Sequence, residues 1–154
     1  MRLFLSALLA LGSVVALWLA LAGGGARSEE RAEHTALSER EWSAIQEVID
    51  DQLRALRRGD AKSAYAHAST PLKVRFANAD EFMTMVRSGY NALLTARTNE
   101  FLEGAVIDGA VMQPLRLILP DDTVLVALYR MEKEQDGAWH IAGCVIARST
   151  VQST

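Results

Sequence analysis

Hydrophobic residues beyond position 37 first recur with the spacing of an amphipathic helix. At 100° per residue, the apolar positions of this stretch fall within an arc of roughly 140°, and they are Trp42, Ile45, Val48, Ile49, Leu53 and Leu56. Ser38 is followed three residues later by Glu41, which is the pattern of a capping box. The pattern predicts a helix that begins after Ser38, runs to Arg58 and ends at Gly59.

Two shorter helices are expected next. Asp60 can cap a helix that continues to about Ala68, and Ser69-Thr70-Pro71 should end it, because proline disfavours helical geometry in the residue before it. Asn78 and Glu81 form another capping pattern, which predicts a third helix through about Ser88, closed by Gly89.

From about Glu100 the pattern changes to that of strands separated by turns. The turn signals are Asp108-Gly109, Pro120-Asp121-Asp122 and Asp136-Gly137. They divide the segment into about four strands. Three helices followed by an antiparallel meander predict an α+β fold, with the helices packed on one face of a curved antiparallel sheet.

The N-terminal segment has a different character. Leu3 to Ala22 contains no charge and follows Arg2, so residues 1–22 are expected to form a helical signal peptide or a membrane anchor. Ala20-Leu21-Ala22 favours cleavage, whereas an apolar run of this length can cross a bilayer. Either alternative places the rest of the chain outside the cytoplasm, in the periplasm or secreted, or anchored to the inner membrane. Residues 23–37 are expected to be a flexible tether and residues 38–150 the folded domain.

Composition and charge exclude several classes of function. The chain carries 16 basic and 19 acidic residues and no basic stripe, so nucleic-acid binding is not expected. The single cysteine, Cys144, excludes an intramolecular disulfide, and its apolar neighbours predict an unreactive buried thiol. No two of the three histidines have metal-ligand spacing, so neither a metal nor another cofactor is expected. We found no Ser-His-Asp arrangement and no phosphate-binding or dinucleotide motif.

The facing of the strands depends on turn length. With two-residue turns at Asp121-Asp122 and Asp136-Gly137, one sheet face should point toward the helices. That inward set is Leu115, Leu117, Val126, Leu128, Trp139, Ile141 and Val145. Further along this face, Gln113, Arg130 and Glu132 should form a polar cluster at the end of an apolar floor that includes Trp139. Tyr65 and Tyr90 could close the resulting site from the helical side. This arrangement predicts a pocket for an apolar small molecule. The alternative is that the three polar residues only mark solvated strand ends. If either turn is one residue longer, the strand facing changes and the three residues no longer lie together.

The same assumption defines an outer sheet face. Its apolar members would include Ile118, Leu125, Ala127, Tyr129 and Ile146. A face this apolar is expected to be covered, either by a second copy of the chain in a homodimer, by another protein, or by the tether.

Several motifs resemble a known family. The long first helix ending in Gly59-Asp60 and the Asp136-Gly137-x-Trp139-x-Ile141 segment resemble the nuclear-transport-factor-2-like superfamily. Further motifs resemble a bacterial family catalogued as domain of unknown function 4864, namely Thr70-Pro71, Phe82-Met83-x-Met85-Val86-x-x-Gly89-Tyr90, Gln113, Tyr129-Arg130-Met131 and Trp139-x-Ile141-x-Gly143-Cys144. The resemblance covers about Ser38 to Arg148. It implies a cone-shaped fold with a cavity between helices and sheet, and a dimer formed through the outer face, but no particular activity.

Three functions follow from these expectations. The first is a non-catalytic module that binds a small molecule or a protein. The second is an enzyme of the isomerase, dehydratase or hydrolase type in the same cavity, although Glu132 is the only acid expected on the inward face. The third is a structural partner domain of an envelope protein.

Overall fold

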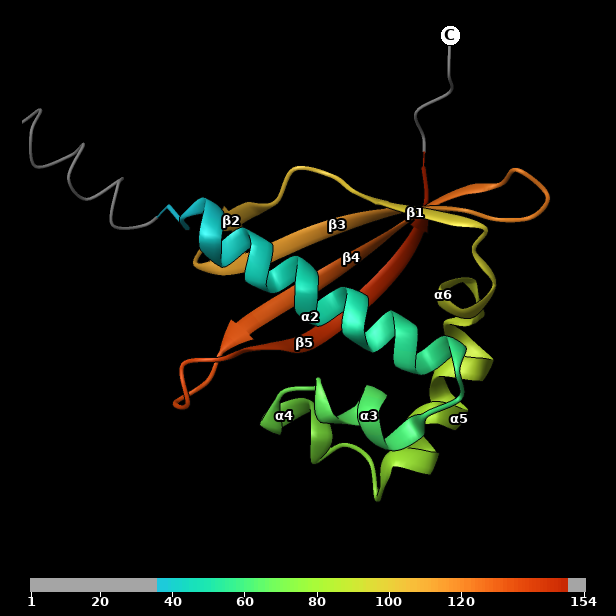
Figure 1. Cartoon of the computed structure of the whole chain (residues 1–154), viewed down its shortest axis with the longest axis horizontal. Coiled ribbons are helices and arrows are strands. Elements are labelled where there is room, and N and C mark those ends of the chain that lie inside the picture. Colours follow the sequence, from blue (N-terminus) through green and yellow to red (C-terminus); the bar gives the residue numbers. More distant parts are fainter. Residues whose placement is uncertain (1–35, 150–154) are drawn as a thin grey trace, which may run out of the picture. The chain divides into compact units, whose positions relative to one another are not determined.

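The computed structural model describes residues 36–149 of the chain. They form an α+β domain in which helices pack on an open antiparallel sheet of five strands (Figure 1). The predicted signal or anchor segment, residues 1–22, and most of the predicted tether lie outside the described residues. Within the described part, no helix combines the length and the apolar character needed to span a membrane.

The first helix of the domain matches its prediction closely. Helix α2 spans Glu39–Arg57, and Ser38 and Glu41 form both hydrogen bonds of the capping box. Its apolar stripe is the deepest part of the core, since Ile45, Ile49 and Leu53 are almost completely buried. Gly59 follows the helix with φ of +72°, a left-handed conformation that glycine adopts without strain.

Four shorter helices follow, two more than the sequence pattern predicts. They are α3 (Ala61–Ala66), α4 (Thr70–Lys73), α5 (Ala79–Gly89) and α6 (Asn91–Thr95). Helices α3 and α5 are the predicted second and third helices. The sequence pattern does not predict α4, because Pro71 indicates a helix end, whereas proline is tolerated in the first turn, where Ser69 caps the helix here. Helix α6 has no side-chain cap, which removes its sequence signal.

The sheet has the order β1-β3-β4-β5, with β2 also paired to β3. The strands are β1 (Thr98–Phe101), β2 (Ala105–Ile107), β3 (Ala110–Ile118), β4 (Val124–Lys133) and β5 (Trp139–Arg148). The first predicted strand is therefore divided into β1 and β2, which share β3 as partner. The division coincides with Pro114 of β3, which has no N–H group to donate. The Gln113 side chain supplies a donor there, with Nε2 2.7 Å from the Leu102 carbonyl oxygen.

The predicted register between β3 and β4 is wrong by one residue. Ile118 pairs with Val124, so Leu119–Thr123 form the connection, and Leu115 pairs with Ala127. Asp122 adopts φ of +63° in this loop. The loop is longer than the two-residue turn assumed from the sequence, and a shift of one residue exchanges the two faces of a strand. As a result Ala127 and Tyr129 point toward the helices, and Arg130 and Glu132 point away.

In the second hairpin, the sheet face to which the β5 side chains point changes partway along the strand. Leu128 pairs with Val145 as predicted, but a register shift lies next to Arg130 and Met131. Trp139 and Ile141, before the shift, are buried against the helices as expected. Beyond it Cys144 contacts the core while Val145, predicted to face inward, is 66% exposed. The irregularity is a β-bulge, which turns the following side chains to the other face.

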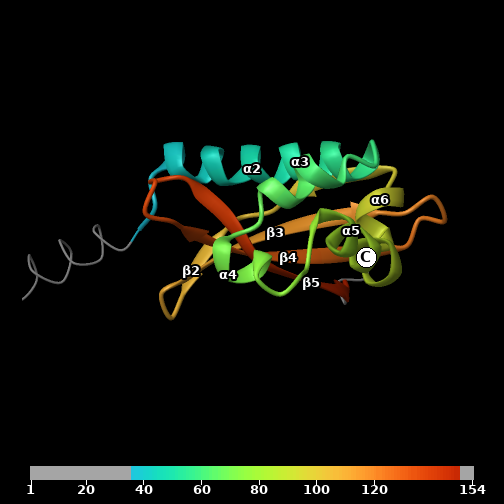
Figure 2. The same cartoon turned by 90° about the horizontal axis from the view of Figure 1, so that it is seen from below.

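These facings give the domain two layers. Helix α2 lies along one face of the sheet (Figure 2), and its apolar stripe packs with the inward residues of β3, β4 and β5 in a single core. Among residues 36–149, no helix packs on the opposite face, which we call the outer face. It carries Met112, Arg116, Ile118, Val126, Leu128, Arg130 and Val145.

Candidate functional site: a cavity between the helices and the sheet

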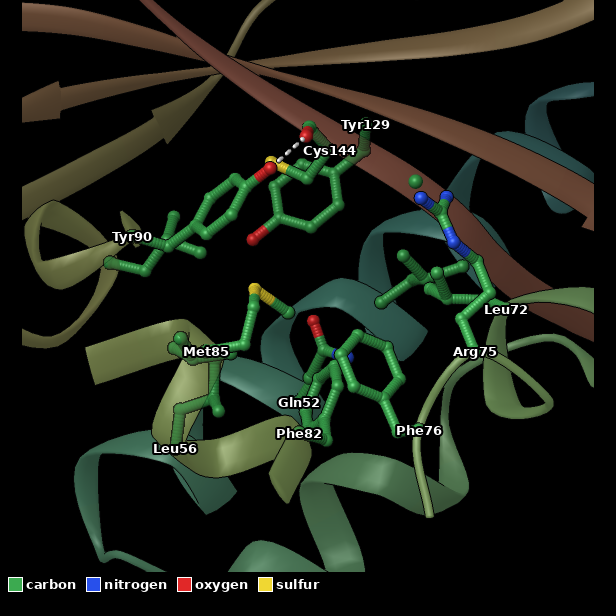
Figure 3. Close-up of a pocket in the computed structure, with 14 residues that line it drawn as sticks. Gln52, Leu56, Leu72, Arg75, Phe76, Phe82, Met85, Tyr90, Tyr129 and Cys144 are labelled. Atoms are coloured by element: carbon green, nitrogen blue, oxygen red, sulfur yellow. Dashed lines mark hydrogen bonds between the residues drawn. The ribbon is translucent and has the colours of Figure 1, made fainter. Parts of the chain in front are cut away.

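A cavity of about 380 Å³ lies between the helices and the inward face of β4 and β5 (Figure 3). This volume is at the lower end of the range of small-molecule sites. Most of its wall is apolar or aromatic. The lining residues are Gln52, Leu56, Leu72, Arg75, Phe76, Phe82, Met85, Val86, Tyr90, Leu93, Tyr129, Ile141, Gly143 and Cys144.

The inner end of the cavity contains two buried polar groups. Tyr129, on β4, is completely buried, and its hydroxyl has no hydrogen-bond partner among the described residues. Burial raises the pKa of this hydroxyl well above its ordinary value of 10, so it stays protonated at physiological pH. Gln52, on α2, is 4% exposed and donates from Nε2 to the Ala64 carbonyl oxygen over 3.2 Å. Figure 3 shows the Tyr129 hydroxyl and the Gln52 amide oxygen both directed into the cavity.

The outer end of the cavity is formed by residues that are partly or fully exposed. They are Leu72, Arg75, Phe76, Met85, Tyr90, Gly143 and Cys144, from α4, the α4–α5 connection, α5 and β5. Arg75 is the only one of the described lining residues that carries a charge at neutral pH. It forms no salt bridge within residues 36–149. We refer to this end as the mouth.

Tyr90 closes one side of the mouth. It follows α5, and its hydroxyl donates to the backbone carbonyl oxygen of Cys144 on β5 over 3.0 Å. Figure 3 shows this bond bridging the helical layer and the sheet. Of the residues predicted for the pocket, Tyr90 is the one that lines the cavity, and it does so from the helical side.

Cys144 contributes a thiol with little reactivity. Burial raises its pKa from 9.0 to about 12. A thiol is nucleophilic only as the thiolate, and this form is scarce at neutral pH when the pKa is so high. The side chain therefore serves as a part of the apolar wall.

A cluster of aromatic rings fixes the shape of the helical wall. Phe82 packs against Tyr65 at a centroid separation of 5.6 Å and edge-on against Phe76 at 5.5 Å. Tyr65 does not line the cavity itself. Its hydroxyl donates to the Lys73 carbonyl oxygen over 2.7 Å, and this bond connects α3 to the C-terminal end of α4.

Helix α4 is tied to the sheet at its start. The Ser69 N–H donates to the Ile141 carbonyl oxygen over 2.9 Å. Glu134, in the β4–β5 connection, accepts hydrogen bonds from the Thr70 N–H over 2.5 Å and from the Thr70 hydroxyl over 3.2 Å. The bond from the Thr70 N–H is the main reason that the pKa of Glu134 is lowered. These contacts hold the segment that carries Leu72 and Arg75 against β5.

The remaining predicted pocket residues lie elsewhere. Gln113 is buried in β3, where it bonds to the backbone of Leu102 and to its own strand. Arg130 and Glu132 are on the outer face, because the β3–β4 register differs by one residue from the predicted one. Arg130 donates weakly to the Ala142 carbonyl oxygen over 3.4 Å. Trp139 is in the core under the Lys133 ammonium group, 5.6 Å from the ring centroid. The structure therefore does not bring these four residues together in the cavity.

The predicted outer-face residues are also redistributed. Ile118 lies on the outer face, whereas Leu125, Ala127, Tyr129 and Ile146 contact the core. Tyr129 moves from a predicted surface position to the centre of the cavity. This correction follows from the longer β3–β4 connection.

One site residue could have been found in the sequence. Gln52 lies three residues after Ile49 and four before Leu56, within the apolar stripe of α2. A polar side chain at such a position must find a partner or line a cavity. Arg75 and Phe76, in contrast, lie in an irregular connection, whose path no periodicity predicts.

A cluster of ionisable groups at the β4–β5 connection lies outside the cavity. His140 Nε2 is 3.4 Å from Asp136 Oδ2 and 3.7 Å from Glu134 Oε2 at the β4–β5 connection. Within the described part of the chain, no group of three or more His, Cys, Asp or Glu side chains is placed to hold a metal ion.

Comparison with known proteins identifies a family that the chain matches. Residues 38–154 match the family described as Domain of unknown function (DUF4864). The match begins at the capping residue of α2 and covers well over half of the 154 residues. No curated protein matches the chain.

Proposed function

The chain belongs to the DUF4864 family, and we propose that its domain is a non-catalytic module that binds a small, largely apolar molecule in the cavity. The observation that supports this proposal is the buried, unpartnered Tyr129 hydroxyl at the inner end of an otherwise apolar space of about 380 Å³. An unpaired buried hydroxyl destabilises the ligand-free fold, and a ligand that pairs with it offsets this cost.

The ionisable groups of the cavity favour binding over acid–base chemistry. Those among the described lining residues are Arg75, Tyr90, Tyr129 and Cys144. A general acid or base works best with a pKa near the operating pH. Burial moves the pKa values of Tyr129 and Cys144 further from neutrality, which leaves both groups poorly suited to that role.

A substitution that fills the mouth tests the proposal. Met85→Trp should abolish binding of the fluorescent apolar probe N-phenyl-1-naphthylamine, because the larger ring occupies the space beside Phe76 and Tyr90. Thr84→Trp is the matched control, since it adds the same ring at an exposed neighbouring position of α5. Equal probe binding by both variants, with unchanged circular dichroism, would contradict a binding site in the cavity.

We also propose that the fold is a variant of the nuclear-transport-factor-2-like cone and that two copies associate through the outer face. Support comes from the layered α+β arrangement and from Val145, which is 66% exposed beside the partly exposed Val126 and Leu128. Apolar side chains gathered on one sheet face favour association. Val145→Asp should convert a dimer to a monomer in analytical ultracentrifugation. A sedimentation coefficient that is the same for both proteins would exclude this interface.

Export is proposed from the sequence alone. The uncharged run from Leu3 to Ala22 after Arg2 supports translocation of the domain across the cytoplasmic membrane. Mass spectrometry of the protein from fractionated cells tests this, because a periplasmic or membrane-attached domain supports export and a cytoplasmic one with an intact N-terminus contradicts it.

A further inference from the structure

The polar groups of the cavity are divided between its two ends. The Tyr129 hydroxyl and the Gln52 amide oxygen lie at the buried end, and the Arg75 guanidinium lies at the mouth. The rest of the buried wall consists of aliphatic and aromatic side chains, among them Leu56, Phe82, Val86 and Leu93. A ligand that satisfies this distribution is polar at both ends and apolar in the middle.

The buried end requires a group that both accepts and donates hydrogen bonds. The protonated Tyr129 hydroxyl is a donor, and it has no acceptor among the described residues. The Nε2 group of Gln52 is already engaged with the Ala64 carbonyl, and its amide oxygen, an acceptor, points into the cavity (Figure 3). A ligand hydroxyl can accept from Tyr129 and donate to Gln52 at the same time.

The mouth requires an anionic group. Arg75 is exposed and has no acidic partner within residues 36–149, and the described lining contains no carboxylate that would compete for it. Its planar guanidinium matches the geometry of a carboxylate, with two parallel hydrogen bonds. Figure 3 shows the guanidinium group directed toward the sheet beside the cavity.

We propose that the ligand is a small amphipathic carboxylic acid that carries a hydroxyl group at the far end of its apolar body. The carboxylate pairs with Arg75 at the mouth, the apolar body fills the space between α5 and the sheet, and the hydroxyl lies between Tyr129 and Gln52. This inference rests on the proposed function and adds the chemical class of the ligand.

Three probes of equal chain length separate the two polar contacts. They are octanamide, octanoate and 8-hydroxyoctanoate, with binding measured by isothermal titration calorimetry on the full domain. Octanoate should bind about two- to fivefold more tightly than octanamide, which is the range expected for an exposed ion pair. 8-Hydroxyoctanoate should bind about three- to tenfold more tightly than octanoate, because its hydroxyl forms buried hydrogen bonds.

Two variants assign these differences to residues. Arg75→Gln should remove the preference for octanoate over octanamide, whereas Arg87→Gln, which removes an exposed arginine of α5 outside the cavity lining, should retain it. Tyr129→Phe should remove most of the preference for 8-hydroxyoctanoate over octanoate. The loss is expected because the ligand hydroxyl then retains only its bond to the Gln52 amide oxygen.

The outcomes distinguish this inference from the proposed function. If none of the three probes binds the unmodified domain, both are contradicted. If all three bind with equal affinity and neither substitution changes the order, the cavity is a binding site but the assigned ligand class is wrong. Binding that follows the predicted orders in the unmodified domain, with each preference lost or reduced in its own variant, supports the inference.

Discussion

Two tyrosines reach the same cavity with hydroxyl groups in opposite situations. The hydroxyl of Tyr129 is buried and has no partner among the described residues, whereas that of Tyr90 is bonded to the Cys144 carbonyl oxygen over 3.0 Å. Removing an unpaired buried hydroxyl relieves a desolvation cost, and removing a bonded one loses a hydrogen bond. The two substitutions to phenylalanine should therefore change stability in opposite directions.

We predict that Tyr129→Phe raises the free energy of unfolding of the ligand-free domain by about 1 kcal/mol and that Tyr90→Phe lowers it by about 1 kcal/mol. Urea denaturation followed by circular dichroism measures both. The pair controls for the loss of an oxygen atom from a tyrosine ring. A loss of stability in Tyr129→Phe equal to that in Tyr90→Phe would mean that the Tyr129 hydroxyl is already satisfied in the free protein.

A second prediction concerns the thiol in the cavity wall. The pKa of Cys144 is about 12 in the folded domain, above its ordinary value of 9.0. Its reaction with 5,5′-dithiobis(2-nitrobenzoic acid) at pH 8 should be at least about tenfold slower than that of the urea-unfolded chain, because thiolate is the reacting species. A folded-state rate equal to the unfolded rate would contradict the burial of this side chain.

The same shift sets the sign of a pH dependence. Because the folded-state pKa is raised, the thiol's contribution to stability is fully present below pH 9 and is lost as the pH rises toward 12. Tyr129 acts in the same direction above pH 10, since burial also raises its pKa. In Cys144→Ala, the decline in the free energy of unfolding that begins near pH 9 should be smaller.

Individual site residues differ in how far the sequence predicts them. Tyr90 directly follows α5, a helix that its capping pattern predicts, so its place relative to that helix can be read from the sequence. The sequence predicts the wrong sheet face for Tyr129. Its orientation depends on the number of residues in the β3–β4 connection, which ends before β4 begins at Val124. An error of one residue in such a count reverses every later side chain of the strand.

At the scale of elements, three capped helices were predictable, whereas α4, which Ser69 also caps, and the uncapped α6 were not. Helices α2, α3 and α5 each begin with a side chain that accepts a hydrogen bond from the helical backbone. Helix α6 has no such cap, and only 5 residues. The bulge in β5 has no sequence signal at all, because it arises from pairing with β4.

A close contact between α2 and the β1–β2 connection gives a prediction at this scale. A Cβ atom on Gly104 would lie 2.3 Å from the ring of Trp42, which packs against the core. Gly104→Ala should therefore lower the free energy of unfolding by about 1–3 kcal/mol, as for other overpacked sites. Thermal or urea unfolding measures the change.

Gly89→Ala is the matched control for this substitution. It adds the same methyl group at the end of α5, where the built Cβ atom has no neighbour within 4 Å. Alanine also has the higher helix propensity, so this variant should be as stable as the parent or slightly more stable. Equal losses in both variants would show that the contact with Trp42 is not responsible.

At the scale of the whole domain, the helices, the sheet and the connections together create the cavity. The α+β class and the position of a cavity between helices and sheet were predictable from periodicity and from the family resemblance. Its lining was not, because it combines residues of α2, α4, the α4–α5 connection, α5, α6, β4 and β5, which approach only in the folded chain. The polar residues inferred from an idealised hairpin, Arg130 and Glu132, lie on the opposite face instead.

The most direct test of the account is to determine where a small amphipathic acid binds on the domain. Intermolecular nuclear Overhauser effects between bound octanoate and methyl groups of the protein measure this in solution. The account predicts contacts from Met85, Leu93 and Ile141, which surround the cavity. Contacts confined to Val145 and its neighbours on the outer face, or none at saturating octanoate, would contradict it.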